Sequence, residues 1–130
     1  MPKTSLKPAQ LDFQPRPTFP YNPGTTAQGL VFVSGQVAWN HEGNVVGIGD
    51  VRAQTIQTLS NVVAVLAEAG ATPADVLKCT VYLADIRYFQ IMNEEFAKVF
   101  KEDPPARTTV QAALAEPEML VEIEAIASIG

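Results

Sequence analysis

The spacing of apolar residues predicts two amphipathic helices. The apolar face of the first helix is formed by residues three or four positions apart: Ile56, Leu59, Val63 and Leu66. Asp50 precedes this helix as a candidate N-cap, and Gly70 follows it where a left-handed residue is expected. The second helix is predicted over residues 87–100, with an apolar face formed by Phe89, Met92, Phe96 and Val99. Between the helices, residues 72–75 have the pattern of a capping box with proline at the first helical position, which predicts a short helical turn.

β-Branched and aromatic residues predict strands around these helices. Residues 30–37 suit a buried strand, and Val45 and Val46 are a candidate returning strand after a turn at residues 42–44. Further strands are predicted over residues 77–84, 107–114 and 120–128. In the last strand one face carries Val121, Ile123, Ala125 and Ala127, and the other carries Leu120, Glu122, Glu124 and Ile126.

This order of elements predicts an α+β fold in which both helices cover one face of a single sheet. The chain has 130 residues, a usual length for one domain. Residues 1–20 are rich in proline, so we expect an extended N-terminal arm rather than a packed element, with Leu11 and Phe13 as a candidate short edge strand. The predicted division is an arm over residues 1–20 and a domain over residues 21–130.

Charge and hydropathy argue against nucleic acid and membranes as partners of this protein. The net charge of −5 argues against nonspecific binding of nucleic acid, because Lys and Arg supply most of the affinity for phosphates. No apolar run approaches the roughly 18 residues that a membrane span requires. The N-terminal residues lack the apolar segment of a secretory signal. We therefore expect a soluble cytoplasmic protein with no nucleic-acid and no membrane partner.

Several chemistries lack their usual residues. The one histidine, His41, falls in the predicted turn and is expected to be exposed, and no serine stands in a nucleophile-elbow motif. Residues 47–49 are only a fragment of a nucleotide-binding glycine loop. The carboxylates show no recognisable metal-ligand spacing around His41. Cys79, the one cysteine, is expected to be an inert thiol buried in a strand.

A few polar residues at the ends of apolar segments are candidates for a site. Arg107 begins a strand, and its guanidinium can hold a carboxylate through two parallel hydrogen bonds or pair with a surface acid. Glu122 lies in an otherwise apolar strand, where a carboxylate needs a partner or a function. Glu124 shares its face and is a candidate for a solvated or ion-paired residue. Asn93 lies near the apolar face of the second helix, where it is either a site residue or a cap for a neighbouring loop.

These residues stand in motifs that resemble the RidA (YjgF/YER057c/UK114) family. The motifs, in the family's order and spacing, are Pro20-Tyr21, residues 30–36 (LVFVSGQ), Asn93, Pro105-Ala106-Arg107 and residues 120–127 (LVEIEAIA). The similarity covers about residues 20–128. The combination of V-S-G-Q, P-A-R and V-E-I-E-A is specific, although each piece alone is not.

The resemblance implies a chorismate-mutase-like fold, a homotrimer with clefts between subunits, and a 2-iminobutanoate/2-iminopropanoate deaminase-type hydrolase acting on C=N bonds. Such enzymes hydrolyse enamines and imines such as 2-aminoacrylate and 2-iminopropanoate to 2-keto acids and ammonia, with no metal or cofactor. It implies that Arg107 binds the substrate carboxylate and that Glu122 positions the attacking water. It also implies that Tyr21, Ser34, Gly35 and Asn93 line the pocket. Burial is expected to raise the pKa of Glu122, and a nearby Arg107 would oppose that shift; the sequence leaves the balance open.

Two departures from the family pattern bear on the substrate. Thr109 stands where many members have a cysteine two positions after the arginine, so a hydroxyl replaces a thiol among the candidate substrate contacts. This replacement is compatible with imine hydrolysis and is expected to affect the choice of substrate. Pro23 stiffens the segment that follows Tyr21, which bears on how that segment closes over a ligand.

Three alternatives remain beside the hydrolysis of small imines. The first is a deaminase of another catabolic enamine, such as 2-aminomuconate. The second is a non-catalytic small-molecule binding or sensor protein, against which the presence of both Arg107 and Glu122 argues. The third is a ribonuclease or translation inhibitor, which the acidic charge and the lack of a basic and aromatic stripe disfavour.

Overall fold

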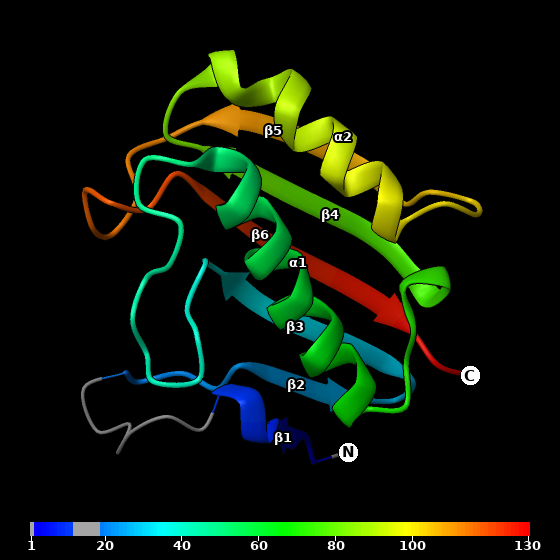
Figure 1. The fold of residues 1–130 in the computed structure, drawn as a ribbon. Coiled ribbons are helices and arrows are strands. Elements are labelled where there is room, and N and C mark those ends of the chain that lie inside the picture. The colour runs from blue at the N-terminus through cyan, green and yellow to red at the C-terminus, as the bar shows by residue number, and fades with distance from the viewer. Residues whose placement is uncertain (1, 12–18) are drawn as a thin grey trace.

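The described residues form one mixed sheet with two helices on one of its faces (Figure 1). The computed structural model describes residues 2–11 and 19–130. In these residues the strands are β1 (Thr4–Leu6), β2 (Gly24–Ala27), β3 (Leu30–Gln36), β4 (Val76–Leu83), β5 (Ala106–Gln111) and β6 (Val121–Ser128). The helices are α1 (Val51–Glu68) and α2 (Phe89–Val99), with short 3-10 turns at η1 (Ala9–Leu11), η2 (Pro73–Asp75) and η3 (Ile86–Tyr88). The predicted α+β class, with both helices on one face of a single sheet, is confirmed.

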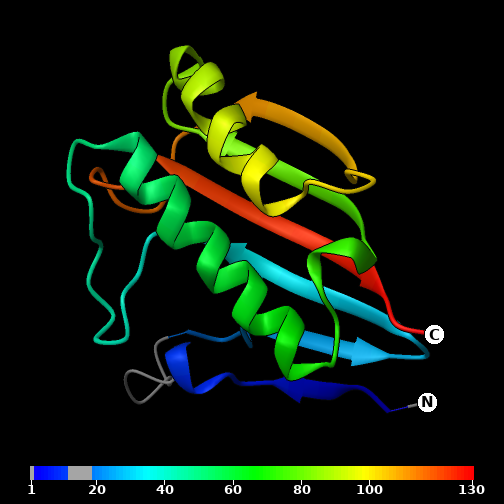
Figure 2. The same ribbon diagram turned by 45° about the vertical axis from the view of Figure 1, so that its right-hand side comes forward.

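The sheet has the order β1-β2-β3-β6-β4-β5. β4 and β5 pair in parallel, and the other neighbours pair antiparallel. α1 packs across β3 and β6, and α2 lies beside α1 on the same side of the sheet (Figure 2). We call the side without these helices the open face. Because the last strand of the chain lies between β3 and β4, residues from distant parts of the sequence become neighbours of β6.

The ends of α1 agree with the prediction, whereas its buried face is rotated. Asp50 caps the helix by accepting a hydrogen bond from the backbone N–H of Ala53 at 3.1 Å, and Gly70 has a φ of +79°. Ile56 is 53% exposed, so its predicted place in the core is wrong. The core instead receives an apolar set from α1 and four polar side chains: Leu59, Val62, Val65 and Leu66, with Gln54, Thr55, Thr58 and Asn61. Hydropathy alone misplaces this face because it counts buried polar residues as exposed ones.

The N-terminal residues pack into the sheet, which corrects the prediction of an extended, unpacked arm. β1 pairs with β2, and Leu6 and Leu11 are 4% and 2% exposed within the core. Gln10 Nε2 also donates a hydrogen bond to Asn61 Oδ1 at 2.7 Å. The predicted edge strand at Leu11 is wrong, because Leu11 lies in η1 and the edge strand is β1. Phe13, the other half of that prediction, lies outside the described residues.

Most other elements agree with the sequence to within a few residues. The capping box of residues 72–75 is present, and the two faces of β6 alternate as predicted. The candidate returning strand near Val45 is reduced to one antiparallel bridge with Trp39. His41 is exposed, as expected. No helix in the described part of the chain is long and apolar enough to cross a membrane.

Asn61 joins α1 to the segment that leaves β3. Its Nδ2 donates hydrogen bonds to the carbonyls of Val37 and Trp39, both at 2.9 Å. Asn61→Ala is expected to lower the free energy of unfolding by about 1–3 kcal/mol, because buried carbonyls lose their donor. Urea titration measures this change. Ser60→Ala, on the exposed side of the same turn, is the control and should change stability by less than about 0.5 kcal/mol; equal effects in the two variants would contradict the prediction.

Candidate functional site

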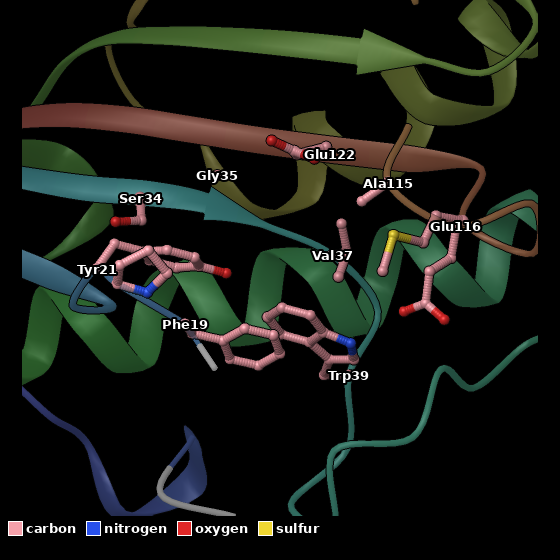
Figure 3. Close-up of a pocket in the computed structure, with 11 residues that line it drawn as sticks. Phe19, Tyr21, Ser34, Gly35, Val37, Trp39, Ala115, Glu116 and Glu122 are labelled. Atoms are coloured by element: carbon pink, nitrogen blue, oxygen red, sulfur yellow. The ribbon is translucent and has the colours of Figure 1, made fainter. Parts of the chain in front are cut away.

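A pocket of about 600 Å³ opens beside β3 and the start of β6 (Figure 3). It contains four of the residues singled out in the sequence: Tyr21, Ser34, Gly35 and Glu122. The remaining lining residues come from the segments before β2, after β3 and before β6: Phe19, Pro20, Val37, Trp39, Ala115, Glu116 and Met119. We call this cavity the Glu122 pocket. The structure therefore brings together side chains that lie a hundred residues apart in the sequence.

Glu122 is half-buried on the open face of β6, directly beside Gly35 of β3. A β-carbon on Gly35 would overlap the Glu122 carboxylate, so only glycine leaves room for it there. Burial raises the pKa of Glu122, and the nearby Glu124 adds to the increase. Glu124 itself accepts a hydrogen bond from the Tyr82 hydroxyl at 3.2 Å. Within one chain, burial therefore determines the direction in which the pKa of Glu122 shifts, and Arg107 does not oppose this shift.

Arg107 lies on the opposite side of the sheet, against α2. Its guanidinium carbon is 5.6 Å from the ring centroid of Phe89 and 4.7 Å from that of Phe96. Nη2 donates a hydrogen bond to Asn93 Oδ1 at 2.5 Å. Among the residues that the structure describes, no carboxylate forms an ion pair with Arg107. The contact with Arg107 favours the interpretation of Asn93 as a site residue. Arg107 keeps a positive charge that no acid of the described chain neutralises.

Arg107 and Asn93 line a second cavity of about 480 Å³. Its other lining residues belong to the end of α2 and the segment before β5: Phe96, Ala97, Phe100, Pro104 and Pro105. We call it the Arg107 pocket. Arg107 pairs in register with Cys79, which is buried on the helix side, whereas Glu122 pairs with Tyr82 on the open face. The structure therefore does not bring Arg107 and Glu122 into one cavity of a single chain.

The other residues named from the sequence occupy supporting positions. The Ser34 hydroxyl donates a hydrogen bond to the carbonyl of Asn22 at 2.6 Å, which ties the Tyr21 segment to β3. Thr109 is half-buried on the same face as Arg107 and lines neither pocket. Cys79 is buried as expected, and burial raises its pKa to about 12. The positive charges of Arg107 and Lys78 oppose this increase. Sequence reasoning missed the contribution of Arg107, because nothing in the sequence indicates that β4 and β5 pair.

Reasoning from the sequence did not identify several residues of the Glu122 pocket, chiefly Phe19, Trp39 and Glu116. All three lie in connections between elements, where periodicity carries no signal. The one available hint was Trp39, the only tryptophan, which follows closely after the V-S-G-Q strand. Across residues 2–11 and 19–130, no group of three or more His, Cys, Asp and Glu side chains is placed to hold a metal ion.

Comparison with known proteins identifies relatives over nearly the whole chain. Residues 12–129 match the family described as endoribonuclease L-PSP. The chain is similar to the crystal structure of YyfA from Yersinia pestis, a protein of the conserved Rid family, with 32% identity, 98% of this chain and 100% of that chain covered, and a TM-score of 0.89. It is also similar to Rv2704 from Mycobacterium tuberculosis, of the YjgF/YER057c/UK114 family, with 30% identity, 98% and 100% covered, and a TM-score of 0.83.

A third relative carries a ligand. The structure of TdcF from E. coli with bound serine has 29% identity to this chain, covers 98% of this chain and 99% of its own, and has a TM-score of 0.85. Fold, motifs and matches agree: the chain belongs to the RidA (YjgF/YER057c/UK114) family.

Proposed function

We propose that this protein hydrolyses imines and enamines derived from α-amino acids, releasing a 2-keto acid and ammonia. The observation that carries the proposal is Glu122, a half-buried carboxylate in a pocket, with a raised pKa and no basic side chain among the lining residues. A carboxylate whose pKa is raised toward neutrality suits general acid–base work. The relative TdcF, which holds serine, supports a ligand that has a carboxylate and a nitrogen on the same carbon.

The proposed reaction needs no protein nucleophile. The substrate is R–C(=NH₂⁺)–COO⁻, whose imine carbon is already electrophilic. Glu122 accepts a proton from a water molecule as the water oxygen bonds to that carbon, which gives a tetrahedral carbinolamine. Glu122 then returns the proton to the nitrogen, and the C–N bond breaks. A further proton then passes from the hydroxyl group to the departing nitrogen. The overall reaction is R–C(=NH₂⁺)–COO⁻ + H₂O → R–CO–COO⁻ + NH₄⁺, which balances in atoms and charge.

We place the complete site between copies of the chain, as a homotrimer with clefts between subunits would provide. The Arg107 pocket of one copy would hold the substrate carboxylate, and the Glu122 pocket of the next would supply the water. Two features support this arrangement. Arg107 and Glu122 lie on opposite faces of one sheet, and the open face bears large apolar side chains at Leu30, Phe32 and Val110, which are 38%, 44% and 39% exposed. Exposed apolar residues gathered on one face are typical of a surface that another subunit covers.

The family description also includes endoribonuclease activity. The Glu122 pocket has two acids, Glu122 and Glu116, and no Lys or Arg among its lining residues. Such a lining repels phosphates rather than binding them. The pocket therefore supports imine hydrolysis better than cleavage of RNA.

A coupled assay tests the proposal. An amino-acid oxidase acting on alanine generates 2-iminopropanoate in situ. Semicarbazide then reacts with the imine that has not been hydrolysed and forms a semicarbazone. We expect the wild-type protein to speed release of pyruvate and to reduce the yield of semicarbazone as its concentration rises. If imine decay stays at the rate in buffer at every protein concentration, the proposal is wrong.

Gly35→Ala is expected to reduce this activity by about 10²-fold, because misplacing a reacting group by about 1 Å costs that much. The added methyl group would displace the Glu122 carboxylate from its position beside β3. The measurement is kcat at saturating 2-iminopropanoate, together with a urea titration to confirm folding. A folded Gly35→Ala protein with wild-type kcat would show that the position of this carboxylate is unimportant.

A further inference from the structure

We infer that the Glu122 pocket selects imino acids with a bulky apolar side chain, aromatic ones above all, through a wall formed by Phe19, Tyr21 and Trp39. This inference rests on the proposed imine hydrolysis and names its substrate class. The ring centroids of Phe19 and Tyr21 are 5.9 Å apart with 24° between their planes. Those of Phe19 and Trp39 are also 5.9 Å apart, with 17° between their planes. Figure 3 shows the three rings along one side of the pocket, across from Glu122.

The size of the cavity favours a large side chain. Its volume of about 600 Å³ lies in the range of pockets that bind drug-sized molecules. The methyl group of 2-iminopropanoate would leave much of this space to water. A phenyl or indole side chain would occupy more of the space and replace more water on the apolar lining.

Buried polar side chains of α1 hold the backbone of Trp39, one member of the wall, and the loop that carries Met119. Asn61 is fully buried and holds the carbonyls of Val37 and Trp39, which anchors the backbone that carries the indole. Gln54 is also fully buried, and its side chain bonds to Glu118 O at 2.8 Å and to Leu120 N at 2.9 Å. These bonds fix the loop that contributes Met119 to the pocket. A preformed apolar wall distinguishes side chains by shape.

The other acid in the lining, Glu116, offers a different mode of selection. It is an exposed carboxylate of the pocket lining (Figure 3), and its negative charge would attract a cationic side chain. We favour the apolar class because Phe19, Pro20, Val37, Trp39, Ala115 and Met119 make up most of the lining. Preference for a cationic imine is therefore one of the results that would overturn the inference.

The test compares imines formed by an amino-acid oxidase from alanine, leucine, phenylalanine and arginine. For the wild-type protein we expect kcat/KM for the phenylalanine-derived imine to exceed that for the alanine-derived imine by about 10–200-fold, the range by which apolar pockets discriminate. The leucine-derived imine should lie between them. Equal values, a preference for alanine, or a preference for arginine would each overturn the inference while leaving imine hydrolysis standing. Absence of acceleration with all four imines would instead overturn the proposed function itself.

Variants then test the wall directly. Trp39→Leu is expected to reduce the phenylalanine-to-alanine ratio about tenfold. Phe19→Leu is expected to act in the same direction, and it serves in place of Trp39→Leu if that protein does not fold. The control is Ile48→Ala, which removes an apolar side chain that is 67% exposed in the same loop as Trp39 and should leave the ratio unchanged. A wild-type ratio in a folded wall variant would show that the rings do not select the substrate.

Discussion

Glu122→Gln is expected to lower kcat for imine hydrolysis by about 10²–10⁴-fold, the usual contribution of one general acid–base group. Glutamine keeps the size and shape of the side chain beside Gly35, but it cannot take a proton from water. The substrate should still bind through its carboxylate, so KM should change much less than kcat. Steady-state measurement with 2-iminopropanoate separates the two effects. A kcat equal to that of the wild-type protein would remove Glu122 from the mechanism.

The pH profile provides a second measurement on the same residue. Because burial raises the pKa of Glu122, wild-type activity should fall on the acid side at a pH above the ordinary range of a glutamate. Glu124→Gln is the matched control on the same face. It should keep kcat and move this acid limb to lower pH, because the Glu124 charge helps to raise the Glu122 pKa. In Glu122→Gln the limb should be absent.

The same pKa shift fixes the direction of a stability effect. A carboxyl group with a higher pKa in the folded protein than in the unfolded chain binds more protons when folded between those two values. Its ionisation therefore costs stability as the pH rises through that interval. Glu122→Gln should therefore be at least as stable as the wild-type protein at neutral pH, and a urea titration of both proteins measures this.

Arg107→Met is expected to lower kcat/KM by about 10²–10⁴-fold, mainly through KM. Two charge-assisted hydrogen bonds to a substrate carboxylate are worth about 1.5–3 kcal/mol each. Methionine keeps an unbranched side chain between Phe89 and Phe96, so packing against α2 is largely preserved. The measurement is kcat/KM with 2-iminopropanoate. An unchanged value would show that another group binds the carboxylate.

Two arginine variants serve as controls for this result. Arg107→Lys keeps the charge but loses the parallel pair of N–H donors, so its kcat/KM should lie between those of the wild-type protein and Arg107→Met. Arg52→Met removes a cation elsewhere on the helix side, where Arg52 bonds to Glu94 at 2.7 Å and to Glu95 at 2.5 Å. It should retain wild-type activity. A similar loss in Arg52→Met would indicate a general effect of charge rather than carboxylate binding at Arg107.

Much of the fold follows from local pattern in the sequence. The alternation in β6, the N-cap at Asp50 and the capping box at residues 72–75 are each determined by neighbours along the chain, and each was predictable. The insertion of β6 between β3 and β4 was not, because strand order depends on contacts between distant segments. The buried polar residues Gln54 and Asn61 were missed for the same reason, since their partners lie in loops far along the chain.

The candidate site was likewise predictable only in part. Family motifs pointed to Glu122, Gly35 and Arg107, and the structure places the first two side by side. The aromatic wall was not foreseen, because Phe19 and Trp39 lie in irregular segments outside those motifs. That Arg107 and Glu122 face opposite sides of the sheet also required the structure, since it depends on the parallel register of β4 and β5.

Mixing two inactive variants is the most direct test of a site shared between copies. Arg107→Met and Glu122→Gln proteins are unfolded together, refolded as mixed assemblies and assayed with 2-iminopropanoate. In a closed ring where each site takes Arg107 from one copy and Glu122 from the next, an equal mixture should recover about a quarter of wild-type activity, because that share of sites receives both intact residues. If the two residues act within one copy, no assembly contains an intact site. Activity that stays at the level of the separate variants would contradict the shared site.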